Sequence, residues 1–280
     1  MFNHLRDDGR PLLMGILNVT PDSFSDGGQF VELDAACIAA ERMVAEGADI
    51  IDIGGESTRP GAHSVDAATQ IARVLPVVAA LVKRLPAHIA ISIDTRSAEV
   101  ARALLGAGAR IINDVAAGND AGMFEAVAEH GGAIVLMHMQ GTPATMQQAP
   151  HYENVVTEVA AFLRARAAAA QAAGIPQDNI ALDPGIGFGK TRVHNLRLLG
   201  ALAELVACDY AVLLGTSRKR FMGAICGETN PRELLGASCA TTALGVAAGV
   251  KLLRVHDVKA NRQAADVAWA IRHQQDEGGA

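Results

Sequence analysis

Short apolar runs alternate with longer, mixed segments along the whole chain. The runs contain almost no polar position, which is typical of strands that helices bury on both faces of a parallel sheet. We predict strands at Leu12–Leu17, Asp49–Ile53, Ile89–Ile93, Arg110–Ile112, Ala133–Met137, Ile180–Leu182, Ala211–Leu214 and Lys251–Val255.

The segments between these runs carry helix signals. Asp66 and Ser97 stand where N-cap residues belong, and Gly131 and Gly174 follow segments that should end there. We predict helices at Leu33–Glu46, Asp66–Arg84, Ser97–Gly106, Asp120–His130, Tyr152–Ala173, Thr191–Ala207, Ser217–Cys226, Pro231–Gly249 and Asp257–His273.

This alternation defines the fold class. Strands and helices alternating eight times over roughly 250 residues predict an α/β fold of the (β/α)8, or TIM barrel, type. The sequence contains no domain linker and no low-complexity segment, so we expect a single domain over residues 1–280. A doubly wound open sheet is the alternative, but it favours a G-x-G-x-x-G turn after the first strand, and that turn is absent.

Composition narrows the classes of function. Hydrophobic residues make up 50% of the chain and aromatic ones 4%, so aliphatic side chains must fill the core. The net charge of -6 argues against a nucleic-acid or anionic-membrane partner. The four cysteines lack C-x-x-C spacing, and the N-terminus lacks an apolar signal region, so we expect reduced thiols and a cytoplasmic protein.

Every predicted strand ends in polar residues. In a barrel the carboxyl ends of all strands face one rim, where active sites form. The residues at these ends are Asn18, Gly54–Arg59, Asp94–Arg96, Asn113–Asp114, His138, Asp183, Thr216–Lys219 and Arg254–His256. Asp94, Asp114 and Ser217 could instead cap the helices that follow them.

Acceptor groups gather on one part of this rim. Asp94, Asn113 and Asp183 follow the third, fourth and sixth strands. Carboxylates accept paired N–H bonds, so this cluster suits a flat heterocycle rich in N–H groups, such as a 2-amino-4-oxo pterin. The same three side chains could alternatively hold Mg²⁺.

Basic groups gather around the seventh, eighth and second strands, where the rim offers Lys219, Arg254, His256, Arg59 and Arg218. Arg254 and His256 stand two residues apart and should point the same way, where they could hold a diphosphate. Lys219 follows the seventh strand, a common position for phosphate sites in barrels. We expect Arg218 to be only a solvated surface charge.

Three loops complete the candidate site. The loops at Thr20–Gly28 and Ser57–Val65 are long enough to be functional, and we interpret them as a lid. The glycines of Gly185–Gly189 permit close backbone approach, but the Lys190-Thr191 pair that follows has the wrong spacing for a Walker loop.

Seven motifs resemble those of dihydropteroate synthases, in family order. They are NVTPDSFSDGG (18–28), IDIGGESTRPGA (51–62), ISIDTR (91–96), INDV (112–115), LDPGIGFGK (182–190), GTSRKRF (215–221) and RVHDV (254–258). The resemblance implies condensation of 6-hydroxymethyl-7,8-dihydropterin diphosphate with p-aminobenzoate. It further implies Mg²⁺ as cofactor, a homodimer, and a sulfonamide target.

The resemblance also assigns roles residue by residue. It implies a pterin diphosphate site at Thr58, Asp94, Asn113, Met137, Asp183, Lys219, Arg254 and His256. It implies a p-aminobenzoate site at Thr58, Arg59, Pro60, Phe188 and Arg220, a metal contact at Asn18, and catalytic roles for Arg59, Lys219, Arg254 and His256. Some family members carry Ser at the position of Arg220, which leaves the geometry of that contact open.

Three other functions stay open at this point. A corrinoid-linked methyltetrahydrofolate methyltransferase would share the pterin pocket, a Schiff-base aldolase would use Lys219, and a non-catalytic protein would only bind pterin.

Leu234–Val250 is apolar nearly all round, so we expect this helix to pack on the barrel and on a second copy of the chain.

Overall fold

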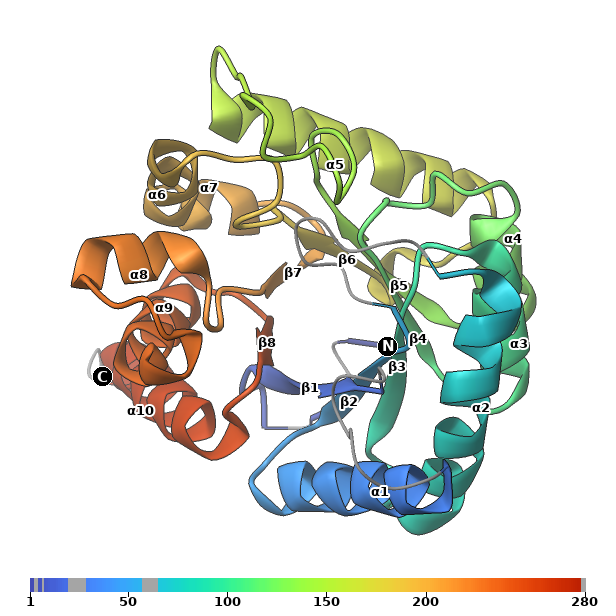
Figure 1. The fold of residues 1–280 in the computed structure, drawn as a ribbon. Helices are drawn as coiled ribbons and strands as arrows, with labels where there is room; N and C mark the ends of the chain where they lie inside the picture. The colour runs from blue at the N-terminus through green and yellow to red at the C-terminus, as the bar shows by residue number, and fades with distance from the viewer. Residues whose placement is uncertain (3–4, 7, 20–28, 57–64, 278–280) are drawn as a thin grey trace.

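Eight parallel strands close into a barrel, and helices surround it (Figure 1). The computed structural model describes residues 1–2, 5–6, 8–19, 29–56 and 65–277. The strands are β1 (Leu12–Asn18), β2 (Ile50–Gly54), β3 (Ala90–Asp94), β4 (Ile111–Asp114), β5 (Ala133–Met137), β6 (Ile180–Asp183), β7 (Ala211–Leu214) and β8 (Leu252–Val255). Each strand pairs with its sequence neighbours, and β8 pairs with β1. The predicted fold class is therefore confirmed.

The helices also follow the predicted order. They are α1 (Gln29–Ala45), α2 (Ala67–Arg84), α3 (Ala98–Gly106), α4 (Met123–Glu129), α5 (Val155–Ala172), α6 (Arg192–Gly200), α7 (Leu202–Val206), α8 (Arg220–Cys226), α9 (Leu235–Ala248) and α10 (Val258–Glu277). Two predicted helices are each divided. The segment 191–207 forms α6 and α7, and the segment 231–249 begins with a 3₁₀ turn at Pro231–Glu233 before α9.

The two predicted N-caps have different outcomes. Asp66 accepts a hydrogen bond from the backbone N–H of Thr69 (2.8 Å), so this cap is confirmed. Ser97 occupies the N-cap position of α3, but its side chain makes no capping bond. Asp120 accepts from the backbone N–H of Ala98 instead (2.8 Å), because the β4–α4 connection brings this carboxylate to the start of α3.

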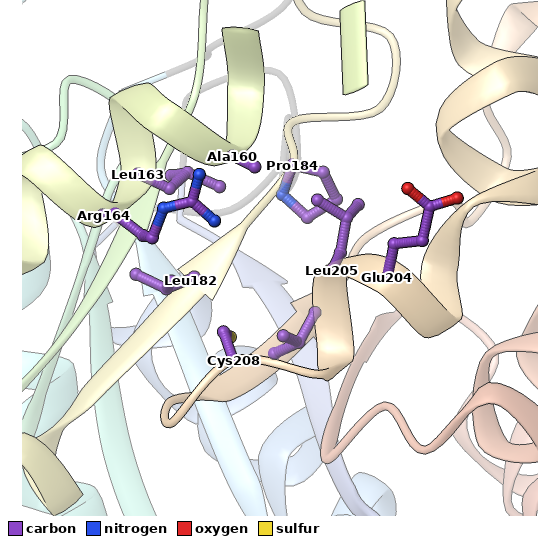
Figure 2. A pocket seen from close by; sticks show the side chains of 9 residues that line it. Ala160, Leu163, Arg164, Leu182, Pro184, Glu204, Leu205 and Cys208 are labelled. Atoms are coloured by element: carbon purple, nitrogen blue, oxygen red, sulfur yellow. The ribbon is translucent and has the colours of Figure 1, made fainter. Parts of the chain in front are cut away.

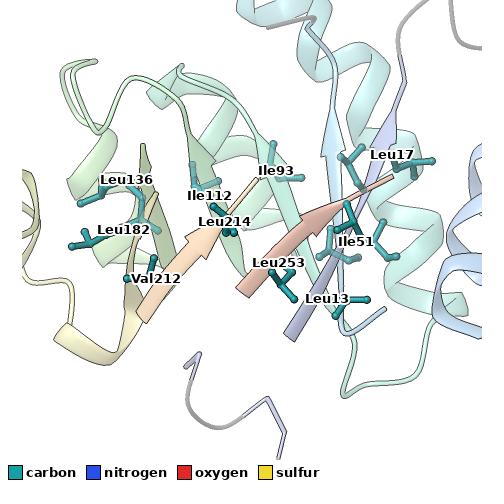
Figure 3. Close-up of a cluster of buried hydrophobic side chains, with 14 of the residues drawn as sticks. Leu13, Leu17, Ile51, Ile93, Ile112, Leu136, Leu182, Val212, Leu214 and Leu253 are labelled. Atoms are coloured by element: carbon teal, nitrogen blue, oxygen red, sulfur yellow. The ribbon is translucent and has the colours of Figure 1, made fainter. Parts of the chain in front are cut away.

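Two apolar layers hold the barrel together. The outward side chains of the strands pack under the helices (Figure 3), and they include Leu13, Leu17, Ile51, Ile93, Ile112, Leu136, Leu182, Val212, Leu214 and Leu253. The inward side chains near the amino ends form a second layer of Phe2, Leu12, Met14, Ile50, Ala90, Ile111, Ala133, Val135, Ala181, Leu213 and Leu252. Each fully buried Leu, Ile or Val contributes roughly 1.5–3 kcal/mol.

The inward layer changes character along the barrel axis. Since side chains alternate between the two faces of a strand, the residue two positions after an inward residue also points inward. Ala90 is inward and apolar, and the same face of β3 continues with Ser92 and Asp94. The barrel interior is therefore apolar at the amino end and polar at the carboxyl end.

Within the part of the chain that the structure describes, no helix is long and apolar enough to cross a membrane. All four cysteines are free thiols, and Cys37 is buried.

Candidate active site

The strand registers bring the predicted acceptor residues together at one end of the barrel. Asp94 pairs with Asn113 across β3 and β4, and Met137 pairs with Asp183 across β5 and β6. Asp94, Asn113 and Asp183 are each at most 6% exposed. Carboxylate and amide groups are thus removed from water in one small region, as the rim hypothesis required.

Asp52 is the centre of this region, and the sequence reasoning missed it. Its side chain is fully buried on β2. It accepts hydrogen bonds from Ser92 Oγ (2.6 Å), Asn113 Nδ2 (3.0 Å) and Arg254 Nε (2.7 Å). An aspartate between Ile51 and Ile53 in a buried strand was the available signal, because such a residue must find partners.

Arg254 lies between two carboxylates. Its Nη2 donates to Asp94 Oδ2 (2.7 Å), in addition to the bond from Nε to Asp52. Two of its nitrogens thus bind buried carboxylates, while the side chain stays 20% exposed at the rim, and its contact with a diphosphate stays a prediction. A guanidinium in this position also disfavours the alternative in which the acceptor cluster holds Mg²⁺.

One carboxylate oxygen of Asp94 has no donor among the described residues. Its Oδ1 is buried and has no hydrogen-bond partner among them. Burial raises the pKa of Asp94 to about 7, although the charge of Arg254 opposes this shift. A buried acceptor without a partner is costly, and a ligand N–H would satisfy it.

Asp183, Phe188 and Lys219 form the neighbouring part of the site. Asp183 Oδ1 accepts from the backbone N–H of Gly185 (2.7 Å), and burial raises the pKa of this carboxyl. Lys219 Nζ lies 4.0 Å from the centre of the Phe188 ring, a cation–π contact. Burial lowers the pKa of Lys219 to about 8, although Asp183 opposes the shift.

Ser217 binds His256 and does not cap α8, whose N-cap residue is Lys219. Ser217 Oγ accepts from the backbone N–H of His256 (3.2 Å) and lies 3.0 Å from its Nδ1. Burial, followed by the charges of Arg218 and Arg254, lowers the pKa of His256 to about 3. The imidazole is therefore neutral and can donate or accept a hydrogen bond, but it carries no charge.

The expectation for Arg218 is wrong. Its Nε and Nη2 donate to the two carboxylate oxygens of Asp257 (3.0 and 2.6 Å), so it is not a solvated charge. Its φ of 60° is unusual for a residue with a side chain, and its backbone N–H donates to Ser238 Oγ. This ion pair fixes the chain immediately before Lys219.

Asp114 does not cap α4, whose N-cap residue is Gly122, but it binds the turn before that helix. Its two oxygens accept from the backbone N–H groups of Ala116 (2.7 Å) and Gly118 (2.6 Å), and burial raises the pKa of this carboxyl to about 6. Asp114 therefore shapes the β4–α4 turn and does not face the site.

A cleft of about 550 Å³ opens on the same rim, above β2 to β5. Its lining includes Met137, Val115, Arg96 and Phe162. Met137 is the predicted pterin residue that joins this cleft to the acceptor cluster. Figure 2 shows a second hollow, which lies outside the barrel between α5 and α7 and has space for about one water molecule. It is far too small for either substrate.

The remaining predicted residues have varied placements. Asn18 ends β1 at the rim and is partly exposed, and Arg220 is exposed at the start of α8. Thr58, Arg59 and Pro60 lie outside the described residues, as do the predicted lid segments 20–28 and 57–64. Among the described side chains, no group of three or more His, Cys, Asp or Glu is arranged to hold a metal ion. A single amide ligand such as Asn18 still fits Mg²⁺, which takes few protein ligands when it binds phosphates.

Comparisons with known proteins agree with this geometry. A family profile described as pterin binding enzyme matches residues 14–256, so the barrel and its acceptor-rich rim define a pterin-binding enzyme. The dihydropteroate synthase of Escherichia coli (strain K12) is 45% identical over 264 residues, which cover 94% of this chain and 93% of that protein. The chain belongs to the dihydropteroate synthase family, as the motifs indicated.

Solved structures of that family have the same fold. The Yersinia pestis dihydropteroate synthase with a sulfonamide drug complex has a TM-score of 0.89 and 43% identity, covering 95% of this chain and 96% of that one. The Xanthomonas albilineans enzyme with 4-aminobenzoic acid has a TM-score of 0.87 and 45% identity, covering 94% and 93%.

Proposed function

We propose that this chain condenses 6-hydroxymethyl-7,8-dihydropterin diphosphate with p-aminobenzoate to give 7,8-dihydropteroate and diphosphate. The observation that carries the proposal is the buried Oδ1 of Asp94, which lacks a partner among the described residues and lies in a cluster with Asn113 and Asp183. The N–H edge of an aminopyrimidinone supplies the donors that such acceptors need.

The basic groups would act on the leaving diphosphate. As the bond to the pterin methylene breaks, negative charge grows on the diphosphate, and Arg254 and neutral His256 would stabilise it by hydrogen bonds. Asn18 would hold Mg²⁺, and the ion would supply positive charge to the diphosphate when bound. Arg254 would keep its bond to Asp52 while presenting its other nitrogens to the ligand, because Asp52 is fully buried and cannot follow.

The aminobenzoate would bind on the side of Phe188 and Lys219. The X. albilineans structure with 4-aminobenzoic acid supports this substrate class. The arylamine is a neutral nucleophile, so the site mainly positions it and excludes water, and the segments with Thr58, Arg59 and Pro60 would close over it. The exposed Arg220 would attract the carboxylate. We propose that the diphosphate leaves first, which a normal secondary isotope effect at the pterin methylene would support.

The chain would act as a cytoplasmic homodimer. All four cysteines are unpaired, as is usual for proteins of a reducing compartment, and this supports the cytoplasm. Large exposed apolar side chains on α8 and α9 (Ile225, Leu235 and Leu244) support an interface that extends over the helix predicted at Leu234–Val250. Sedimentation as a monomer at micromolar concentration would contradict the dimer.

A coupled assay tests the reaction. The chain is incubated with Mg²⁺ and both substrates, and diphosphate and dihydropteroate are measured together. We expect equal amounts of both from the unaltered chain and from Lys83→Ala, an exposed control. Lys219→Ala and Arg254→Ala should each lower kcat/KM by about 100-fold or more, as expected for groups that contact the transition state. Bound pterin without either product would instead indicate a non-catalytic protein.

A further inference from the structure

Lys190 is a buried lysine that the proposed reaction does not use, and burial lowers the pKa of its ammonium to about 7, although the charge of Asp183 opposes this shift. The residue is only 3% exposed. The ammonium lies within hydrogen-bond distance of three carbonyl oxygens, those of Gly185 (3.0 Å), Phe188 (2.9 Å) and His138 (3.1 Å). His138 Nδ1 is a fourth neighbour at 3.0 Å. These acceptors use all three N–H donors of the ammonium, so it cannot serve a substrate directly.

His138 is matched to this ammonium. Burial, followed by the charge of Lys190, lowers the pKa of His138 to about 3, so the ring is neutral and Nδ1 can accept. The ring itself packs edge-on against Phe162, whose side chain lines the cleft. The contacts of Lys190 therefore connect His138, directly after β5, with Phe162 at the cleft.

Lys190 is one of several side chains that bind the loop Gly185–Gly189, since Asp183 Oδ1 also accepts from the N–H of Gly185 (2.7 Å) and Asn195 Oδ1 from that of Gly187 (2.7 Å). Gly185 and Gly189 both have positive φ (66° and 58°), and a side chain at Gly185 would collide with the carbonyl of His138. Backbone in this region is permitted to glycine but is not fixed by it. Tyr152 donates to the carbonyl of Gly189 (2.8 Å), and Gln147 Nε2 donates to that of Gly187 (3.0 Å).

We infer that Lys190 is a positioning residue, whose ammonium fixes the Gly185–Gly189 loop so that the Phe188 ring stays beneath the Lys219 ammonium. The inference rests on the proposed function, because it assigns Lys190 to the aminobenzoate half of that site. Phe188 connects the two lysines, because Lys190 donates to its carbonyl and Lys219 Nζ lies 4.0 Å from its ring centre. An apolar residue at 190 would remove the lysine donor from the buried carbonyls of Phe188 and His138, whereas that of Gly185 would keep the N–H of Phe188.

Lys190→Met tests the inference because it keeps length and removes every donor. Lys251→Met is the matched control, since Lys251 is a half-buried lysine at the opposite end of the barrel. Amide hydrogen exchange of residues 185–190 should be about tenfold faster in Lys190→Met and unchanged in the control, because the loop opens locally. The amides of β5 and β6 should keep their protection.

Kinetics separate positioning from general structural support. In Lys190→Met, KM for p-aminobenzoate should rise about tenfold while the dissociation constant of the pterin diphosphate changes less than about threefold. If Lys190→Met does not fold, Tyr152→Phe removes one bond to the same loop and should shift both measurements in the same direction. Unaltered exchange, or an equal loss in both substrates, would overturn the inference. If the unaltered chain makes no dihydropteroate, the proposed function fails, and the exchange measurement alone decides whether Lys190 holds the loop.

Discussion

The substitution Asp52→Asn removes the charge of Asp52 and should lower the free energy of unfolding of the substrate-free protein. The carboxylate is fully buried and accepts hydrogen bonds from Ser92, Asn113 and Arg254. An asparagine of the same shape fits the same space, so the substitution changes charge and hydrogen bonding without creating a cavity.

The magnitude follows from the three bonds. The Ser92 hydroxyl can rotate and accept from the new amide N–H, so that bond is kept. The amide oxygen can then face Asn113 and Arg254, and the main loss is the negative charge opposite the Arg254 guanidinium. A hydrogen bond to a charged group contributes about 1.5–3 kcal/mol, and Arg254 retains its bond to Asp94. We therefore expect the free energy of unfolding to fall by about 2 kcal/mol, below the loss for a buried charge with no partner left.

Urea unfolding followed by circular dichroism measures this change. Asp34→Asn is the matched control, because Asp34 forms an ion pair with Arg84 (3.1 Å) in which both side chains are exposed. That pair is screened by solvent and should contribute little. Equal midpoints for Asp52→Asn and Asp34→Asn, with an unchanged dependence on urea, would refute the view that the interior ion pair supports the barrel.

Two further predictions concern Asp94 and the start of α3. Because the pKa of Asp94 is raised to about 7, pterin affinity should fall about tenfold per pH unit below pH 7 as the acceptor is protonated, and calorimetric titration would detect this. The same shift means that this carboxyl's contribution to stability decreases as pH rises between about 4 and 7, since only the folded state keeps the proton there. Asp120→Ala should cost about 1 kcal/mol in thermal unfolding and Ser97→Ala much less, because only Asp120 caps α3. A pH-independent affinity, or equal losses in the two alanine variants, would contradict these predictions.

The fold could be predicted because buried strands leave a strong trace in the sequence. Ala133–Met137 and Ala211–Leu214 have the predicted bounds, and β1, β6 and β8 differ from theirs by one residue at one end. β2 and β3 lie one residue further along the chain than predicted, and β4 begins one residue and ends two residues later. The divided helices were missed for a local reason. Gly200 ends α6 before α7 begins, and a single glycine in a helical pattern does not distinguish a break from a tolerated position.

The rim residues could be predicted because each is a polar residue directly after an apolar strand. Their partners could not, because pairing depends on strand register and on side-chain direction. Arg254 was predicted to hold a diphosphate, but its bonds to Asp52 and Asp94, on strands that do not pair with β8, could not be predicted. Arg218 was expected to face water, but the turn that carries it brings it to Asp257.

Asp52 and Lys190 escaped notice for a common physical reason: each satisfies other groups of the protein and neither follows the rule of a polar residue at a strand end. The alternation of side chains nevertheless contains the information for Asp52. Once Ile50 is assigned to the barrel interior, Asp52 must also point inward, and a carboxylate there requires donors from facing strands. No such alternation applies to Lys190, because it binds carbonyl groups of the Gly185–Gly189 loop. The backbone path of a loop does not follow a sequence period, so these contacts could not be predicted. The polar interior of a barrel is thus predictable one layer below the rim, whereas a buried lysine that holds a loop becomes visible only when the backbone it binds has been placed.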